Sequence, residues 1–234
     1  MENVISICGY KGSGKTSLIL EVAKFLKVQG YKVAVVKSSH VEEVLTDKPH
    51  SDTWKYREAG VEAVLFLQKE LFTLYLSPRE VDVAYILEGL FWNFDLVLCE
   101  GLKGFEPIPK LWMLKDSQEL EEVLPKLRNL LGIVAKSKEE IEELKKKYNW
   151  LEFFHVEEMD RIVKFVKEKA KLEEDRVKLF VNKRRIGLKP FIKEFLKVPF
   201  LEMVKLLKNV PEDLREIEFK IKIISKNLLD KKAK

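Results

Sequence analysis

The sequence predicts an α/β protein with a mostly parallel sheet covered by helices on both faces, and three observations support this. A short apolar run, VISIC at residues 4–8, leads into a glycine-rich stretch and then a helical pattern that stops at Gly30. Continuous apolar character from Val33 to Val36 completes a strand–helix–strand unit. A third apolar run, Leu96 to Cys99, delivers an acidic residue at its end. Unbroken apolar runs are typical of parallel strands with both faces buried.

The glycine-rich stretch GYKGSGKTS follows the first predicted strand directly and matches the pattern G-x-x-x-x-G-K-[ST]. Glycines let the backbone wrap an anion with its N–H groups, and the following helix adds free N–H groups and a positive dipole end. We therefore predict the P-loop NTPase fold, a three-layer sandwich. The lysine would reach the β- and γ-phosphates, and the threonine hydroxyl would bind Mg²⁺. The predicted nucleotide-binding residues are Gly9, Lys11, Gly12, Ser13, Gly14, Lys15, Thr16 and Ser17.

Glu100 ends the third apolar run and precedes Gly101. Ligands of open α/β sheets bind beyond the carboxyl ends of the strands, where the phosphate loop also lies. We predict that Glu100 acts as a Walker B group that holds Mg²⁺ or its water, with Lys15 as the other catalytic residue. Asp95 enters the same strand earlier and is expected at the opposite end of the sheet. A carboxylate that only caps the next turn is the alternative for Glu100.

The remaining elements follow in order along the chain. SDTWKYREAG predicts a short helix with Ser51 or Asp52 at its N-cap and Gly60 after its end. EAVLFLQ and LFTLYL predict a pair of strands that turn at Lys69 and Glu70. A helix from about Pro78 to Leu90 precedes the Glu100 strand. PKLWML, LLGIVAKS and WLEFFHV predict further strands, and KEEIEELKKKY and EEMDRIVKFVKEKAK predict helices.

The pattern changes near LEED, so we predict a nucleotide-binding domain at residues 1–172 and a small appended α+β module at residues 176–234. RVKLFVNKRRIGLK predicts a hairpin that turns at NKR. PFIKEFLKVPFLEMVKLLKNV predicts one or two helices interrupted before Pro199, and REIEFKIKII predicts an alternating strand.

Composition bounds the function classes. The chain has 234 residues, of which 46% are hydrophobic, so it can bury a sizeable core. Its net charge of +5 is only weak evidence for a nucleic-acid partner. Its apolar runs are far shorter than the roughly 20 residues that span a bilayer, and its start shows no signal-peptide pattern, so we expect a cytoplasmic protein without a membrane or nucleic-acid partner. Cys8 and Cys99 lie within apolar strand patterns and are expected to be buried.

Several spaced motifs resemble the molybdopterin-guanine dinucleotide biosynthesis adapter family, MobB. They are GYKGSGKTSL, VVKSSH, DKPHSDTWKYREAGVEAVL and LVLCEGLKGFEPIPK, which together span most of residues 4–112. Leu111 and Trp112 stand where this resemblance predicts polar or charged residues. Within the matching segments, Asp52 is a further candidate metal ligand, and the candidate contacts to substrate or phosphate are His40, Arg57 and Lys103.

The resemblance implies a GTP-binding, Mg²⁺-dependent protein, usually homodimeric, with at most slow GTPase activity. It implies a role in molybdenum or tungsten cofactor biosynthesis, assisting a MobA-like nucleotidyltransferase that attaches a guanine nucleotide to molybdopterin, with the molybdenum-insertion enzyme as a second candidate partner. Guanine specificity does not follow from the residues, because the Asn-Lys-x-Asp signature of many GTPases is absent.

Two alternatives share the phosphate loop. A small-molecule kinase would require a mobile lid with arginines over the transferred phosphate. A metal-insertion accessory GTPase would be expected to carry clusters of cysteine or histidine. The sequence contains neither feature in recognisable form.

Overall fold

The computed structural model describes residues 3–39, 46–76, 82–91, 93–172, 177, 179–181, 184–186, 188–210 and 217. The chain divides into two compact units, residues 1–174 and 175–234. The division into a nucleotide-binding domain at residues 1–172 and an appended module at residues 176–234 stays a prediction.

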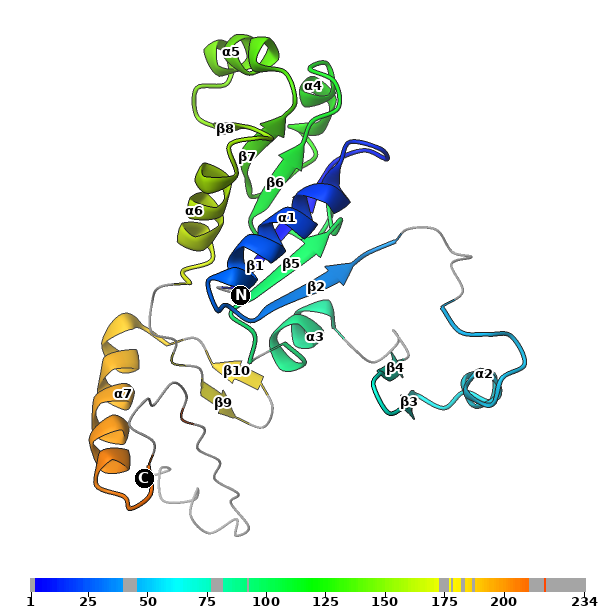
Figure 1. Cartoon of the computed structure of the whole chain (residues 1–234), viewed down its shortest axis with the longest axis vertical. Helices are drawn as coiled ribbons and strands as arrows, with labels where there is room; N and C mark the ends of the chain where they lie inside the picture. The colour runs from blue at the N-terminus through cyan, green and yellow to red at the C-terminus, as the bar shows by residue number, and fades with distance from the viewer. Residues whose placement is uncertain are drawn as a thin grey trace, which may run out of the picture. The chain divides into compact units, whose positions relative to one another are not determined.

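The first unit is built around a six-stranded parallel sheet with the order β2-β5-β1-β6-β7-β8 (Figure 1). Strand β1 lies in the middle, and the chain moves to one side of it through β2 and β5 and to the other side from β6 onward. This reversal beside β1 creates the position at which open α/β sheets bind ligands. The strands are β1 Val4–Cys8, β2 Val33–Lys37, β5 Leu96–Glu100, β6 Lys110–Met113, β7 Leu130–Ala135 and β8 Glu152–His155.

Helices cover both faces of this sheet, so the predicted α/β fold class is confirmed. Alternate strand residues such as Ile5 and Ile7 pack with α1 and α6, while Val4 and Cys8 belong to clusters on the other face. Those clusters contain residues of α3, α4, α5 and the β5–β6 loop. The helices are α1 Lys15–Val28, α3 Val83–Gly89, α4 Glu119–Val123, α5 Lys138–Lys147 and α6 Met159–Lys169.

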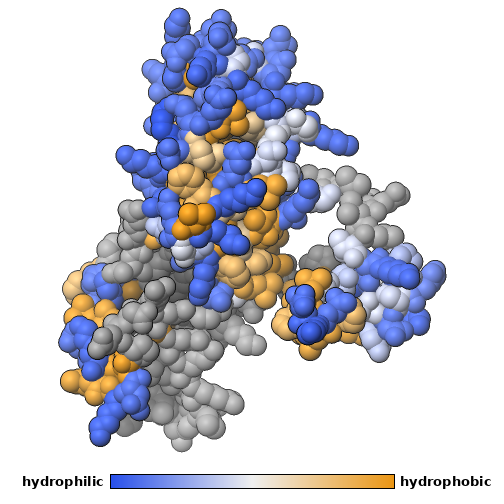
Figure 2. Space-filling model, in the orientation of Figure 1, coloured by the Kyte–Doolittle hydropathy of each residue, from blue (hydrophilic) through white to orange (hydrophobic). Residues whose placement is uncertain are grey.

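Residues 46–76 contain α2, Asp52–Glu58, followed by an antiparallel hairpin of β3, Ala63–Leu67, and β4, Phe72–Leu76. The predicted hairpin turn at Lys69 and Glu70 is confirmed. The side chain of Ser51 accepts a hydrogen bond from the Trp54 amide, so Ser51 is the N-cap of α2. Figure 2 shows hydrophobic residues at the surface of this hairpin.

Four of these hairpin side chains share one face. Leu67 lies opposite Phe72, and Leu65 opposite Leu74, and directly opposed residues project to the same side of a ladder. All four are exposed, with Phe72 at 70% and Leu67 at 62%. On the opposite face, Val64 is buried. We call the set of Leu65, Leu67, Phe72 and Leu74 the hairpin apolar face.

The second unit contains the antiparallel pair β9, Leu179–Val181, and β10, Arg184–Ile186, followed by α7, Pro190–Lys205. The predicted interruption before Pro199 is wrong, because α7 continues through it. An internal proline removes one backbone hydrogen bond and bends a helix without ending it when good helix formers flank it. The predicted strand REIEFKIKII lies outside the described residues, apart from Ile217.

Candidate functional site

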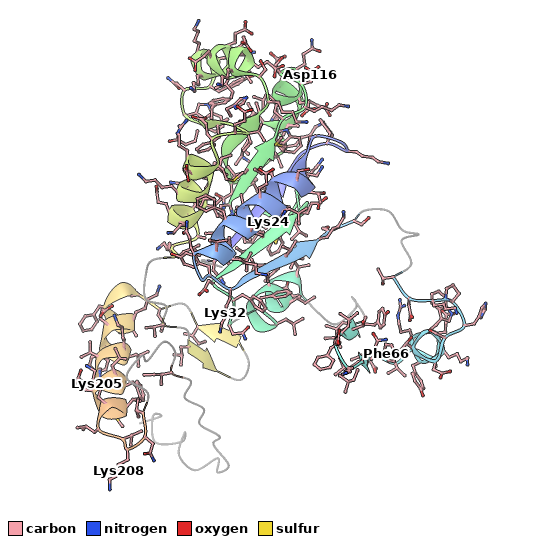
Figure 3. The ribbon with its side chains drawn as sticks, in the orientation of Figure 1. Lys24, Lys32, Phe66, Asp116, Lys205 and Lys208 are labelled. Carbon is pink, nitrogen blue, oxygen red and sulfur yellow. The ribbon has the colours of Figure 1, made fainter. Side chains whose placement is uncertain are left out.

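The phosphate loop connects β1 to α1 at the carboxyl edge of the sheet. Asp116, after β6, and Lys32, before β2, help to locate the carboxyl and amino edges (Figure 3). Gly9 has a φ of 152°, and a Cβ atom there would lie 2.5 Å from the Met113 carbonyl oxygen. No other residue type fits this position without moving β6. Glycine at position 9 therefore allows the backbone to pass close to the end of β6.

The loop brings two predicted residues to the start of α1. Lys15 Nζ donates a 2.7 Å hydrogen bond to the Tyr10 carbonyl, so its side chain folds back over the loop. Thr16 Oγ1 donates a 3.0 Å hydrogen bond to Glu100 Oε2. Residues far apart in sequence, at the end of β5 and the start of α1, thus meet at one point.

Both positive and negative side chains lie where Thr16 meets Glu100. Lys37, at the end of β2, lies with its Nζ 3.4 Å from the second carboxylate oxygen of Glu100. Burial lowers the pKa of Lys15, and the nearby negative charge of Glu100 only partly offsets that effect. Desolvated lysines beside an anion-binding loop gain most from an anion, because the ligand replaces the solvation that burial removes.

Ser13 is the one described residue with a buried side-chain oxygen that lacks a hydrogen-bond partner. It is 1% exposed and lies in the centre of the phosphate loop. Buried polar groups are normally satisfied, so an orphaned hydroxyl marks a place where a polar partner is missing. The loop glycines, Lys15 and this hydroxyl together fit a phosphate group.

The peptide after Glu100 is held from β1. Ser6 Oγ donates to the carbonyl of Gly101, and Cys8 Sγ lies 3.1 Å from the same oxygen. Gly101 has a φ of 98°, and a Cβ atom there would lie 3.2 Å from the Ser38 carbonyl oxygen. These contacts orient the end of β5, so the Glu100 carboxylate is directed toward Thr16.

Lys103 lies in the β5–β6 loop beside the phosphate loop. Its Nζ lies 4.7 Å from the centre of the Tyr10 ring and 4.9 Å from that of Trp112. Tyr10 and Trp112 themselves pack edge to face, and Trp112 donates to Glu119 of α4. Leu111 and Trp112, where the resemblance predicted polar residues, are buried in β6 and act in packing.

Of the other candidate residues, Asp52 and Arg57 lie within residues 46–76, and His40 lies outside the described residues. Arg57 forms a 3.3 Å ion pair with Asp47 and stacks over the ring of Tyr75. Asp52 pairs with Lys55 at 2.9 Å and is largely exposed. Within the part of the chain that the structure describes, neither forms a hydrogen bond or ion pair with the phosphate loop. His40 lies outside the described residues, so its role stays a prediction, as do those of Asp52 and Arg57.

Sequence reasoning did not assign Asp47 or Lys37. Asp47 is buried and accepts hydrogen bonds from Thr53, Ser51 and Arg57. Burial alone would raise its pKa, but these hydrogen bonds outweigh burial and lower the pKa. Lys37 carried a usable signal, because it ends a strand at the same edge as Glu100. Asp47 carried none, because its partners meet only after α2 forms.

The donor set fits a magnesium ion better than a transition metal. Thr16 and Glu100 offer only oxygen, and Mg²⁺ takes one or two protein oxygens while it keeps most of its waters. Among the described residues, no group of three or more His, Cys, Asp or Glu side chains is arranged for a metal. A ligand-held ion between Thr16 and Glu100 would replace their mutual hydrogen bond.

The sheet order and the loop geometry define the chain as a P-loop protein with the NTPase fold. A family model described as molybdopterin guanine dinucleotide synthesis protein B, MobB, matches residues 4–136, more than half of the chain. The chain belongs to the MobB family.

Relatives support this membership. A Haemophilus influenzae protein named molybdopterin-guanine dinucleotide biosynthesis adapter protein is 34% identical over 134 residues, which cover 56% of this chain and 73% of that protein. The Escherichia coli protein of the same name is 25% identical over 117 residues, covering 48% of this chain and 66% of that protein. The crystal structure of Bacillus subtilis MobB matches with a TM-score of 0.58 and 25% identity over 71% of this chain and 97% of its own.

Family membership agrees with the adapter prediction and does not favour the kinase or metal-insertion alternatives. Among the described residues, no helix combines the length and apolar character needed to cross a bilayer.

Proposed function

We propose that the chain is a GTP-binding adapter in the biosynthesis of the molybdopterin guanine dinucleotide cofactor. The contact between Thr16 and Glu100 carries this proposal, because it joins the phosphate loop to a carboxylate at the carboxyl edge of the sheet. Lys15 would contact the β- and γ-phosphates, and the loop from Gly9 to Ser17 would wrap them. The guanine preference rests on membership of the MobB family.

Mg²⁺, when bound with the nucleotide, would neutralise phosphate charge from a position at Thr16 and Glu100. Glu100 already contacts Thr16 and Lys37. This arrangement suits a residue that holds a metal or its water more than one that removes a proton. We therefore propose slow GTP hydrolysis, well below the roughly one turnover per second of ordinary enzymes.

The proposed partner is a MobA-like nucleotidyltransferase in the cytoplasm, with the molybdenum-insertion enzyme as a second candidate. We also propose that the chain forms a homodimer, with the hairpin apolar face covered by a second copy. Four neighbouring apolar side chains on one face of a two-stranded ladder are costly to leave in water. An isolated hairpin of this kind is at best marginally stable without further packing.

Calorimetric titration with GTP and with ATP, each with Mg²⁺, tests the nucleotide assignment. We expect tighter binding of GTP and loss of that binding in Lys15→Ala. Lys24→Ala is the matched control, because Lys24 lies on the exposed side of the same helix α1, away from the loop (Figure 3). This variant should bind GTP as the unmodified chain does.

Two results would contradict the proposal. Preference for ATP, with transfer of its phosphate to a small acceptor, would favour the kinase alternative. Absence of binding to either nucleotide would leave only the fold in place.

A further inference from the structure

Strand β1 carries one polar residue, Ser6, between the apolar residues Ile5 and Ile7. The side chain of Ser6 is 0% exposed, and its hydroxyl donates a hydrogen bond to the carbonyl oxygen of Gly101, just after β5. A polar side chain inside a sheet costs free energy unless it is hydrogen-bonded. This bond joins residues 95 positions apart, so Ser6 ties the start of the β5–β6 loop to the central strand.

The position of the Gly101 carbonyl depends on side chains of β1. The ladder between β1 and β5 ends with Ile7 paired to Glu100, and the Gly101 amide extends it by donating to the Ile7 carbonyl at 3.1 Å. The Gly101 carbonyl lies beyond this ladder and is approached by the Ser6 hydroxyl and by Cys8 Sγ. A thiol is a weak donor, so the hydroxyl supplies the stronger of the two contacts.

The turn that Ser6 holds has an unusual backbone. Gly101 has a φ of 98°, and the next residue, Leu102, has a φ of 54°. The left-handed region is unfavourable for leucine, and such a conformation persists only where its surroundings hold it. The turn directly follows Glu100, whose carboxylate accepts the hydrogen bond from Thr16. A turn that relaxed would therefore shift Glu100 away from Thr16.

The contacts of Ser6 separate the metal from the phosphates. Among the residues that the structure describes, the Ser6 side chain forms hydrogen bonds with Cys8 and Gly101. The groups expected to bind phosphate are the backbone of residues 9–17 and the Lys15 ammonium, and the Ser6 side chain is bonded to none of them. Loss of the Ser6 hydroxyl should therefore affect Glu100 without changing the phosphate contacts.

We propose that Ser6 is a positioning residue for the magnesium ion that accompanies the nucleotide. It holds the turn at Gly101 and Leu102, so that the Glu100 carboxylate stays beside Thr16. The inference rests on the proposed function and deepens it, because it assigns to a buried residue of β1 part of the strength with which Mg²⁺ promotes nucleotide binding.

Calorimetric titration of Ser6→Ala with GTP, once with Mg²⁺ and once with EDTA, tests this role. The ratio of the two affinities measures how much the metal promotes binding. We expect this ratio to fall about tenfold, the size of one hydrogen bond, and the affinity in EDTA to stay unchanged. Ser6→Cys keeps a weak donor of similar size and should recover part of the ratio.

Asn3→Ala is the matched control. Asn3 is 7% exposed, and its side-chain amide donates a 2.9 Å hydrogen bond to the Phe94 carbonyl. This bond also joins a side chain at β1 to the backbone beside β5, but it lies at the amino edge of the sheet, before β5 begins. The variant should lose a comparable amount of stability in chemical denaturation and keep the ratio of the unmodified chain.

Three results would overturn the inference. The first is an unchanged ratio in Ser6→Ala. The second is an equal fall of the ratio in Asn3→Ala, because the effect would then follow from lost stability alone. The third is an unmodified chain that binds GTP equally well with Mg²⁺ and with EDTA. Failure of the proposed function is distinguishable, since the unmodified chain would then bind no GTP under either condition.

Discussion

At the residue scale, the end of β5 shows how a buried side chain is tuned by its surroundings. Cys99 precedes Glu100 and is fully buried within the sheet. Burial raises the pKa of its thiol from 9.0 to about 12. Burial also raises the pKa of Cys8. Thiols with such high pKa values are inert, which agrees with their predicted role as small apolar core residues.

Cys99 should make the fold less stable at alkaline pH. A pKa that is higher in the folded state contributes stability that is complete below pH 9.0 and is lost as pH rises toward about 12. We expect the free energy of unfolding to fall over this range by up to about 1.4 kcal/mol per pH unit through this group.

Chemical denaturation at several pH values checks this expectation. Below pH 9, Cys99→Ala should lower stability by about 1 kcal/mol, because it leaves a small cavity. Above pH 9 the variant should show a flatter slope, so this deficit should shrink as the pH rises. An unchanged slope would show that the thiol does not titrate differently in the folded and unfolded states.

At the element scale, the β5–β6 loop depends on one buried lysine. Lys110 is 1% exposed, and its ammonium donates to the carbonyls of Phe105, Ile108 and Arg128 at 2.8 to 3.0 Å. Burial lowers its pKa, partly offset by Cys8 and Glu106. The loop packs through Ile108 on the sheet and carries Lys103 to the phosphate loop. Lys110 thus holds together the loop that carries Lys103 to the phosphate loop.

Lys110→Met should destabilise the chain by about 3 kcal/mol, because three buried carbonyls would lose their charged donor. Equilibrium denaturation measures this loss, with Lys146→Met as an exposed lysine control that should cost almost nothing. A loss below about 1 kcal/mol would show that the loop carbonyls find other donors.

The segment of residues 46–76 has its own anchor in Asp47. The ion pair with Arg57 and the hydrogen bonds from Ser51 and Thr53 lower the pKa of this carboxyl despite its burial. A lowered pKa contributes stability that is present above the ordinary carboxyl pKa and is lost as pH falls through the lower folded value. The contribution is therefore complete at neutral pH.

Asp47→Asn should loosen α2 and leave the six-stranded sheet unchanged, because the lost contacts all lie within residues 46–76. Hydrogen exchange should show faster exchange of the α2 amides, including Trp54. Asp52→Asn is a matched control, since its exposed pair with Lys55 contributes little. Equal exchange rates in the two variants would contradict an anchoring role for Asp47.

How far the sequence could predict the elements depends on their length and surroundings. The strand, loop and helix from Val4 to Val28 could be predicted because three local signals agree. These are the apolar run of the strand, the glycine and lysine positions of the phosphate loop, and the helical spacing of apolar residues after it. Helix α4, Glu119–Val123, was missed because five residues give little periodicity. The interruption assigned to Pro199 was wrong because a single internal proline can bend a helix without ending it, and α7 continues through Pro199.

Site residues divide in the same way. Glu100 was predictable from its place at the end of an apolar run, and its meeting with Thr16 followed from the shared sheet edge. The same rule applies to Lys37 at the end of β2, but its approach to Glu100 depends on β2 lying beside β5, which no local pattern encodes. The role of Asp47 could not be predicted, because Ser51, Thr53 and Arg57 come together around it only when α2 has formed.

At the scale of the whole molecule, the hairpin apolar face underlies the proposed homodimer. Phe72→Lys and Leu67→Lys place charge at two directly opposed positions on that face. We expect the double variant to convert a homodimer into a monomer in light scattering after size-exclusion chromatography, because a buried unpaired charge is strongly unfavourable.

Val28→Lys is the control, since Val28 is exposed on α1 at 90% and lies away from the hairpin in sequence. It should leave the dimer intact. A double variant that stays dimeric, or an unmodified chain that is already monomeric, would contradict the assembly proposed for this face.

The adapter role is tested most directly by the yield of molybdopterin guanine dinucleotide from a MobA-like nucleotidyltransferase, measured with GTP, Mg²⁺ and molybdopterin present. Each reaction would contain no adapter, the unmodified chain or Lys15→Ala. We predict that the unmodified chain raises the yield and that Lys15→Ala does not. Equal stimulation by the two chains would contradict the claim that nucleotide in the phosphate loop controls the adapter, and no stimulation by either would contradict the adapter role itself.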